Sequence, residues 1–241
     1  MKYRNAILIV LLVIVADQLL KFYIKTHFVN GDDVKIAGSW FRLHFIENEG
    51  MAYGMKLSES VVGKLLLSSF RLIAVVFGFY LLSRLIKKGY GKGVIICGSL
   101  ILAGALGNLI DSVFYGLIFT DSPYSCFSGY YDGLSSMMQT HNQTAVAHLT
   151  KFGQGYGKFL QGKVVDMLYF PVLETKLPGW VPYMGGKNFV FFEPVFNIAD
   201  AAISVGVLTL VFFQKSLIHK PADTNTNPPA AEPGSTIADI Q

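Results

Sequence analysis

The apolar residues of this chain gather into four long blocks instead of alternating with polar residues at short intervals. An apolar block of about 18 or more residues with few charges is typical of a transmembrane helix, and such a block can cross a hydrocarbon core of about 30 Å. The blocks cover residues 6–24, 61–86, 93–114 and 195–217. The pattern therefore predicts a mainly α-helical membrane protein with four spans.

The composition agrees with this prediction. Of the 241 residues, 52% are hydrophobic and only 15% are charged, whereas soluble domains carry about 25% charged residues. The first block could instead be a cleavable secretory signal. However, Asp17 and Lys21 follow its apolar centre, where a signal would have a small-residue cleavage site. We therefore expect this block to remain as the first span.

Basic residues predict the orientation, because Lys and Arg in short flanks favour the cytoplasmic side. Lys2 and Arg4 precede the first block, and Lys215 and Lys220 lie at the end of the fourth. The link between the second and third blocks carries Arg84, Lys87, Lys88 and Lys92. With four spans these three sites share one side, so both termini are expected in the cytoplasm.

The segments 25–60 and 115–194 are then extracytoplasmic, and they contain stretches rich in β-branched and aromatic residues. We expect these stretches to form strands of a small sheet on the outer membrane surface. They are Val34–Phe45, Lys163–Val172 and Asn188–Val195. Residues 121–160 are rich in Gly, Ser, Tyr and Gln, a composition that predicts an irregular, mobile loop. We interpret this loop as a surface insertion.

Residues 1–220 are expected to form a single membrane domain. The tail 221–241 is rich in Pro, Ala, Asn and Thr, a composition typical of disorder. Cys97 and Cys126 fall in the third block and in an outer segment, so no disulfide framework is expected. The net charge of +4 follows from the topology, and no basic surface with interleaved aromatic residues suggests a nucleic-acid partner.

The apolar blocks contain carboxylates and amides, which are costly inside a membrane and usually mark function or a packed polar cluster. At a rise of about 1.5 Å per residue, Asp17 lies in the outer half of the first span. Asn108 and Asp111 lie near the outer end of the third, and Asn197 and Asp200 in the first turns of the fourth. Residues three apart share a helix face. We therefore expect one polar pocket between the helices, just below the outer surface.

Carboxylates dominate this pocket, and two carboxyl groups that share one proton can activate water and protonate a leaving amine. That chemistry is the chemistry of an aspartyl protease. A Ser–Lys dyad would need a serine at the level of Lys21, and Ser112 and Ser204 are the near candidates. The histidines are scattered and predict no zinc site.

Five short segments carry a resemblance to a known family. They are Asp17–Lys21, Asn48–Gly54, Gly104–Asp111, Val164–Asp166 and Phe196–Ala201. With these segments in this order on four spans, the chain resembles bacterial lipoprotein signal peptidase, also called signal peptidase II. The resemblance covers all four spans and both outer segments, and residues 121–160 are its main unmatched part.

The resemblance implies an aspartyl endopeptidase of the bacterial inner membrane. It implies four helices with a small extracytoplasmic sheet, and an active site near the extracytoplasmic face. Such enzymes remove the signal peptide of diacylglyceryl-modified prolipoproteins by cleavage before the lipid-modified cysteine. They need no metal or organic cofactor, and globomycin inhibits them. The expected partners are lipid-modified prolipoproteins and membrane lipids, and we expect a monomer.

The resemblance also implies roles for single residues. Asp166 and Asp200 match the two catalytic aspartates. The residues that match substrate-binding or dyad-positioning residues are Asn48, Gly50, Asn108, Asp111 and Asn197. Asp17 and Lys21 match a supporting polar face of the first helix. Taken alone, Asp166 follows a short apolar run and is typical of an exposed strand end, so only the resemblance singles it out.

One position departs from the family pattern. The family usually has Arg after the aspartate of the third span, and Ser112 stands there in this chain. As a hypothesis, Arg71 of the second span supplies the missing positive charge. This would make Arg71 a further supporting residue.

Two readings from other classes compete with a protease. Intramembrane carboxylates also serve as relays in proton- or ion-coupled transporters. The small number of spans and the lack of an internal repeat weigh against a transporter. A non-catalytic scaffold is the other alternative, and it predicts that Asp200→Asn would leave function intact.

Overall fold

The computed structural model describes residues 1–48, 61–122, 146–171, 173–176, 179–180, 186, 188–191 and 194–217. Gly50, Cys126 and the tail 221–241 lie outside the described residues, so the predictions made for them stay predictions. Among the described residues, four helices are long and apolar enough to cross a membrane. They are α1 (Tyr3–His27), α2 (Val61–Lys87), α3 (Lys92–Ile110) with its continuation to Ile118, and α5 (Ile198–Leu217). The predicted four-span membrane fold is confirmed.

Helix α3 is the centre of the bundle. In its most apolar stretch 56% of the residues are buried, against 17–22% in the other three spans. Small residues on α3 allow α5 to approach it closely. A Cβ atom on Gly104 would lie 2.2 Å from the carbonyl oxygen of Ala199 on α5. Only glycine lets the two backbones meet there.

The third span changes its helical form where its polar residues begin. After α3 ends at Ile110, residues Asp111–Tyr115 form a π-helical turn, η2, followed by the short helix α4 (Gly116–Ile118). The backbone N–H of Gly162 donates to the carbonyl of Ser112 at 2.9 Å. π-helical turns are frequent at functional sites. The sequence pattern predicts a regular helix here, because helical spacing alone does not reveal this turn.

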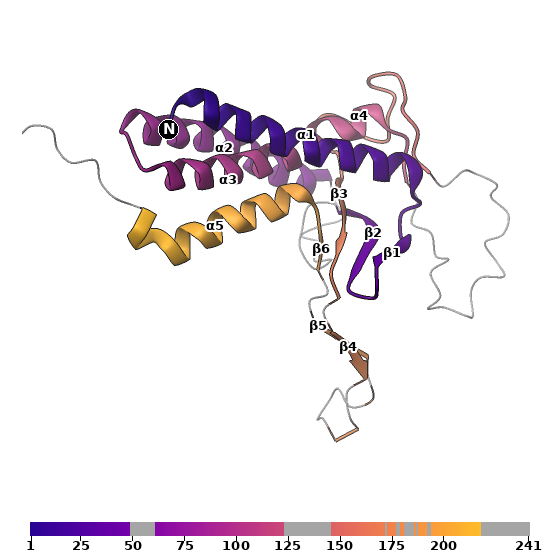
Figure 1. The fold of residues 1–241 in the computed structure, drawn as a ribbon. Helices are drawn as coiled ribbons and strands as arrows, with labels where there is room; N and C mark the ends of the chain where they lie inside the picture. Colours follow the sequence, from indigo (N-terminus) through magenta and orange to yellow (C-terminus); the bar gives the residue numbers. More distant parts are fainter. Residues whose placement is uncertain are drawn as a thin grey trace, which may run out of the picture.

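A four-stranded antiparallel sheet lies at one end of the helix bundle (Figure 1). We call this end of the bundle the sheet end. The strand order is β1 (Asp33–Ala37), β2 (Phe41–Asn48), β3 (Val164–Tyr169) and β6 (Val195–Phe196). Strands β4 (Leu173–Lys176) and β5 (Asn188–Phe191) form a separate two-stranded sheet. In Figure 1 this hairpin extends away from the helices.

The small sheet is confirmed, but its details differ from the prediction. The stretch Val34–Phe45 holds parts of β1 and β2 with a turn between them. The stretch Asn188–Val195 holds β5 and the first residue of β6, and the described part of Lys163–Val172 holds β3 alone. Helix α5 begins at Ile198 and not at Val195, since Val195 and Phe196 pair with β3. Part of the loop predicted to be mobile is held in place. Between residues 148 and 157, backbone groups bond to those of residues 116–120.

Candidate active site

The start of α5 places Asp200. Asn197 precedes the helix, and its side-chain oxygen accepts a hydrogen bond from the backbone N–H of Asp200 at 2.9 Å. The Asp200 carboxylate in turn accepts from the backbone N–H of Asn197 at 3.3 Å. This reciprocal arrangement is a capping box, in which the cap fixes both side chains. The sequence Asn197–Asp200 therefore determines the position of the carboxylate.

A second carboxylate, from α1, also caps α5. The Oδ1 atom of Asp17 accepts a hydrogen bond from the backbone N–H of Ala199 at 2.9 Å. The first N–H groups of a helix lack partners within the helix and form its positive end. A Cβ atom on Gly107 would lie 2.8 Å from the Asp17 carboxylate. The glycine on α3 thus makes room for the contact between α1 and α5.

Strand β3 brings Asp166 to the same place. The strand pairs with β2 in a register that sets Asp166 opposite Ile46. The side-chain amide of Asn197 donates to Asp166 Oδ1 at 2.7 Å, and that of Asn48 donates to Oδ2 at 3.3 Å. Asn197 therefore contacts both aspartates, one through its oxygen and the other through its nitrogen.

Burial and charge shift the titration of Asp166. The pKa of Asp166 is raised to about 7: burial and, next, the neighbouring charge of Asp200 raise it, and Lys21 and the amides of Asn48 and Asn197 only partly oppose them. Two carboxyl groups close together in a buried site do not both ionise readily. Asp166 is therefore able to hold a proton near neutral pH.

Lys21 links the polar residues of α1 and the third span. Its ammonium group is fully buried. It lies 2.9 Å from a carboxylate oxygen of Asp17 and 2.7 Å from one of Asp111, and it donates to Asn108 Oδ1 at 2.9 Å. Asn108 then donates from Nδ2 to Asp200 Oδ1 at 2.7 Å. One amide thus connects the buried lysine to the proposed dyad.

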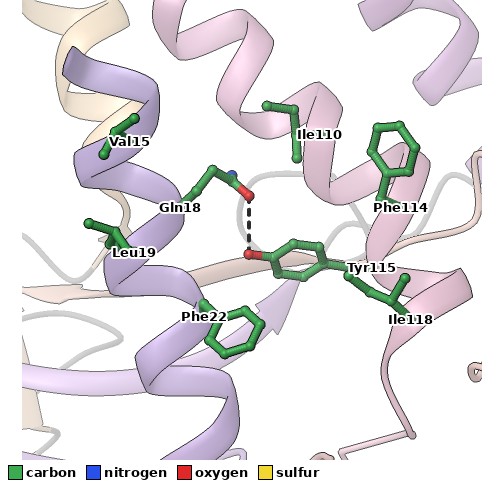
Figure 2. Close-up of a pocket in the computed structure, with 8 residues that line it drawn as sticks. All are labelled: Val15, Gln18, Leu19, Phe22, Ile110, Phe114, Tyr115 and Ile118. Carbon is green, nitrogen blue, oxygen red and sulfur yellow. Dashed lines mark hydrogen bonds between the residues drawn. The ribbon is translucent and has the colours of Figure 1, made fainter. Parts of the chain in front are cut away.

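Asp111 supports the strand that carries Asp166. Its Oδ2 atom accepts a bond of 3.4 Å from the backbone N–H of Val165, and its Oδ1 atom accepts one of 2.8 Å from Gln18. The hydroxyl of Tyr115 donates to Gln18 at 3.2 Å. Figure 2 shows this last bond among the residues of an apolar groove between α1 and the third span. The groove does not contain the aspartate pair.

The contacts of Ser112 contradict the Ser–Lys alternative for this residue. Arg71 of α2 donates from Nη1 to Ser112 Oγ at 2.8 Å, and Ser112 donates to the carbonyl of Asn108 at 2.9 Å. No bond joins Ser112 to Lys21, whose ammonium group is taken by two carboxylates and an amide. The hypothesis that Arg71 reaches this position agrees with its contact to Ser112.

A second buried network lies further along α1. The ammonium group of Lys25 is fully buried, pairs with Glu47 of β2 and donates to Ser122 Oγ at 3.1 Å. Glu47 lies 3.3 Å from Lys163, which lies 2.9 Å from Asp121. No pattern in the sequence singles out these residues. Lys25 stands at the end of a span, where a lysine is ordinary, and its partners are distant in the sequence.

The structure brings together every predicted site residue that it describes. These are Asp17, Lys21, Asn48, Arg71, Asn108, Asp111, Asp166, Asn197 and Asp200. Gln18 belongs to the same network, and sequence reasoning missed it as a site residue. An amide in an apolar span next to Asp17 was the available signal. Within the described ranges, no group of three His, Cys, Asp or Glu side chains could hold a metal ion.

Solved structures resemble this fold. One is a bacterial membrane enzyme structure obtained by the in meso method at 2.3 Å resolution, with a TM-score of 0.50 and 22% identity. The similarity covers 89% of this chain and 90% of the other. A second bacterial membrane enzyme, at 1.9 Å resolution, has a TM-score of 0.51 and 20% identity over 88% of this chain and 93% of the other. At this identity the likeness concerns the fold alone.

Sequence similarity identifies the family of the chain. The family described as Signal peptidase (SPase) II matches residues 9–215. The lipoprotein signal peptidase of Porphyromonas gingivalis is 44% identical over 86% of this chain and 80% of its own length. That of Amoebophilus asiaticus is 34% identical over 88% of this chain and 78% of its own length. The chain therefore belongs to the signal peptidase II family of aspartic peptidases.

Proposed function

We propose that this peptidase removes the signal peptide from diacylglyceryl-modified prolipoproteins, with Asp166 and Asp200 as its catalytic dyad. One observation carries the assignment of the dyad. Two carboxylates from different elements are both bonded to Asn197, and one of them, Asp166, has a pKa raised to about 7. An ionised and a protonated carboxyl group at one site are the pair that aspartic proteolysis requires.

The environments of the two residues suggest their starting states. Asp166 is buried and keeps its proton near neutral pH. Asp200 lies at the positive end of α5 and accepts hydrogen bonds from Asn108 and from the backbone of Asn197. A helix N-terminus and N–H donors stabilise a negative carboxylate. Asp200 then starts as the base and Asp166 as the acid.

The reaction follows from these states. Asp200 takes a proton from water while the water oxygen attacks the scissile carbonyl carbon, and Asp166 gives its proton to the carbonyl oxygen. The resulting diol collapses as the carbon–nitrogen bond breaks. Asp200 passes its proton to the leaving nitrogen, and a hydroxyl proton of the diol returns to Asp166. The supporting polar residues keep their charges throughout.

The membrane setting suits a lipid-modified substrate. Burial of acyl chains favours the bilayer by about 0.8 kcal/mol per CH₂, so such a substrate reaches the protein from the side. Asp200 lies in the first turn of α5 and Asp166 on β3, and both elements meet at the sheet end of the membrane-spanning helices. The basic flanks support an inner-membrane protein with both termini in the cytoplasm and the sheet end outside. We further expect a monomer that globomycin inhibits.

The test is cleavage of a diacylglyceryl-modified prolipoprotein by purified protein in detergent. The wild type should cleave before the modified cysteine, and globomycin should stop it. Asp166→Asn and Asp200→Asn should fold and show no activity, whereas Asp33→Asn, on the exposed strand β1, should cleave like the wild type. Cleavage that survives either substitution in the pair would refute the dyad.

The same assay checks the expected pH dependence. Because Asp166 must hold a proton and its pKa is raised to about 7, kcat/KM should fall as the pH rises through this value. The apparent pKa values from such a profile belong to the pair of carboxyl groups and not to one residue, since the two groups interact. A kcat/KM that stays constant from about pH 5 to about pH 9, roughly two units either side of the transition near 7, would contradict Asp166 as the acid.

A further inference from the structure

Arg71 is a charged residue inside a membrane-spanning helix. It lies about 15 Å along α2 from Val61, at roughly 1.5 Å per residue, well inside the span. A charged side chain at such depth is expensive unless other groups compensate it. Its guanidinium donates to the hydroxyl of Ser112, which is fully buried in the third span. The charged group therefore points into the bundle.

The position of Arg71 gives it a direct electrostatic effect on the dyad. The guanidinium interacts with the carboxylates of Asp111, Asp200 and Asp166. The other nearby cation, Lys21, is already bonded to Asp17 and Asp111. Arg71 thus contributes a second positive charge, from another helix, to the surroundings of the two dyad carboxylates.

The balance of charges around the dyad depends on Arg71. Among the described residues, the charged groups around the dyad are Asp17 and Lys21 on α1, Arg71 on α2, Asp111 on η2, Asp166 on β3, Asp200 on α5, and the more distant Glu47–Lys25 pair. With one proton on the dyad, three negative charges face two positive ones. Without Arg71 three would face one, and a buried cluster relieves such an imbalance by taking up a proton.

We propose that Arg71 is a positioning residue that keeps the dyad singly protonated, through a guanidinium held in place by Ser112. This inference rests on the proposed function and deepens it. The ionised carboxylate that activates water exists only while the second proton stays off. Ser112 provides the acceptor that directs the α2 side chain toward the dyad.

The experiment compares the charge at position 71 with the geometry there. Arg71→Gln removes the charge and keeps a polar side chain, and Arg71→Lys keeps the charge. At low pH, on the acid limb where the group that activates water takes up the second proton, Arg71→Gln should lower kcat about tenfold or more with KM nearly unchanged, since one pKa unit corresponds to a factor of ten. In a plot of kcat/KM against pH, both the rise on the acid side and the fall on the alkaline side should move to higher pH. Arg71→Lys should keep the wild-type limbs with a smaller loss of kcat.

A second variant tests whether the effect comes from a positive charge near the dyad or only from the packing of the Arg71 side chain. In the Arg71→Gln background, Ser112→Arg supplies a guanidinium from the third span and should return both limbs toward their wild-type pH. A second readout does not depend on cleavage. The infrared band of protonated carboxyl groups, assigned with Asp166→Asn, should be stronger at pH 7 in Arg71→Gln than in the wild type.

The outcomes separate the two proposals. Wild-type limbs and an unchanged infrared band in folded Arg71→Gln would overturn the role of Arg71. If that variant does not fold, Arg71→Lys carries the test, and displaced limbs despite its retained charge would overturn the role. A wild type that cannot cleave prolipoprotein would refute the proposed function, and the infrared comparison would still decide the role of Arg71.

Discussion

Two buried lysines on one helix show how the same residue serves two different parts of this molecule. Lys21 and Lys25 are four residues apart on α1, and both ammonium groups are fully buried. Lys21 pairs with Asp17 and Asp111, and Lys25 pairs with Glu47. Burial and pairing are therefore alike in the two cases.

The two lysines differ in the residues to which their partners are connected. Lys21 contacts Asn108, and Asn108 bonds to Asp200. Lys25 contacts Glu47, which continues through Lys163 to an exposed aspartate at the surface. The first cluster ends at the proposed dyad, and the second ties the sheet and the 146–163 segment to α1. A buried charge thus indicates a polar network, and only the connections of the network indicate function.

The largest expected effect comes from removal of either lysine. Lys21→Met leaves two buried carboxylates without the ammonium group that pairs with them, and Lys25→Met leaves the buried Glu47 with the more distant Lys163, at 3.3 Å, as its partner. Breaking a buried pair costs about 3–5 kcal/mol, so both variants should unfold at lower temperature in detergent. Activity per folded molecule should separate them, since it should vanish in Lys21→Met and persist in Lys25→Met.

A double variant is the control for this comparison. Replacing both members of a buried pair by apolar residues is often neutral or stabilising. Lys25→Met with Glu47→Leu should therefore recover most of the lost thermal stability and retain cleavage. Lys21→Met with Asp111→Leu should stay inactive whatever its stability. An inactive but folded Lys25→Met/Glu47→Leu protein would mean that the second network also serves the dyad.

A smaller effect is expected from Asn108, the link between the lysine and the dyad. Asn108→Ala removes the 2.7 Å bond to Asp200 and the acceptor of Lys21. A hydrogen bond to a charged group contributes about 1.5–3 kcal/mol, so kcat should fall by about 10- to 100-fold. Ser99→Ala on the same helix removes only a local bond of 2.7 Å to Ile95 and should leave kcat unchanged. Equal kcat values for the two variants would contradict the linking role.

The two networks also differ in how far the sequence predicts them. A carboxylate or amide in a membrane span is costly, so Asp17, Asn108 and Asp200 stand out from their apolar surroundings. Asp166 does not stand out in the sequence, because it lies outside the four apolar blocks, where a carboxylate is ordinary. Its role depends on the register of β3 against β2 and on the amide of Asn197. Only the family resemblance singles it out in advance.

The second network and the π-helical turn could not be predicted in this way. Lys25, Glu47 and Lys163 come from three segments that are distant in the sequence and meet only when the sheet docks on α1. The turn at Asp111–Tyr115 depends on contacts with the segment that includes Gly162, where a Cβ atom would lie 1.9 Å from the carbonyl oxygen of Asp111. No local pattern in either segment encodes these tertiary contacts.

The smallest effect should come from the outer end of the second network. Burial alone would raise the pKa of Asp121, but the hydrogen bond and charge of Lys163 outweigh it and lower the pKa. A lowered acid pKa contributes stability above the unfolded value of about 3.9, and this stability is lost as the pH falls through the folded value. The Asp121 side chain is 61% exposed, and exposed pairs contribute less than about 1 kcal/mol.

Asp121→Asn should therefore reduce thermal stability slightly at neutral pH, and the difference should vanish once the pH falls below the lowered pKa of the folded carboxyl, where the wild-type group is also protonated. High salt should shrink the difference further, because it screens exposed charges. The kcat/KM profile should match that of the wild type, including its fall near pH 7. A displaced fall would show that the surface end of the Lys25 network reaches Asp166, and the two lysines would then serve one connected site.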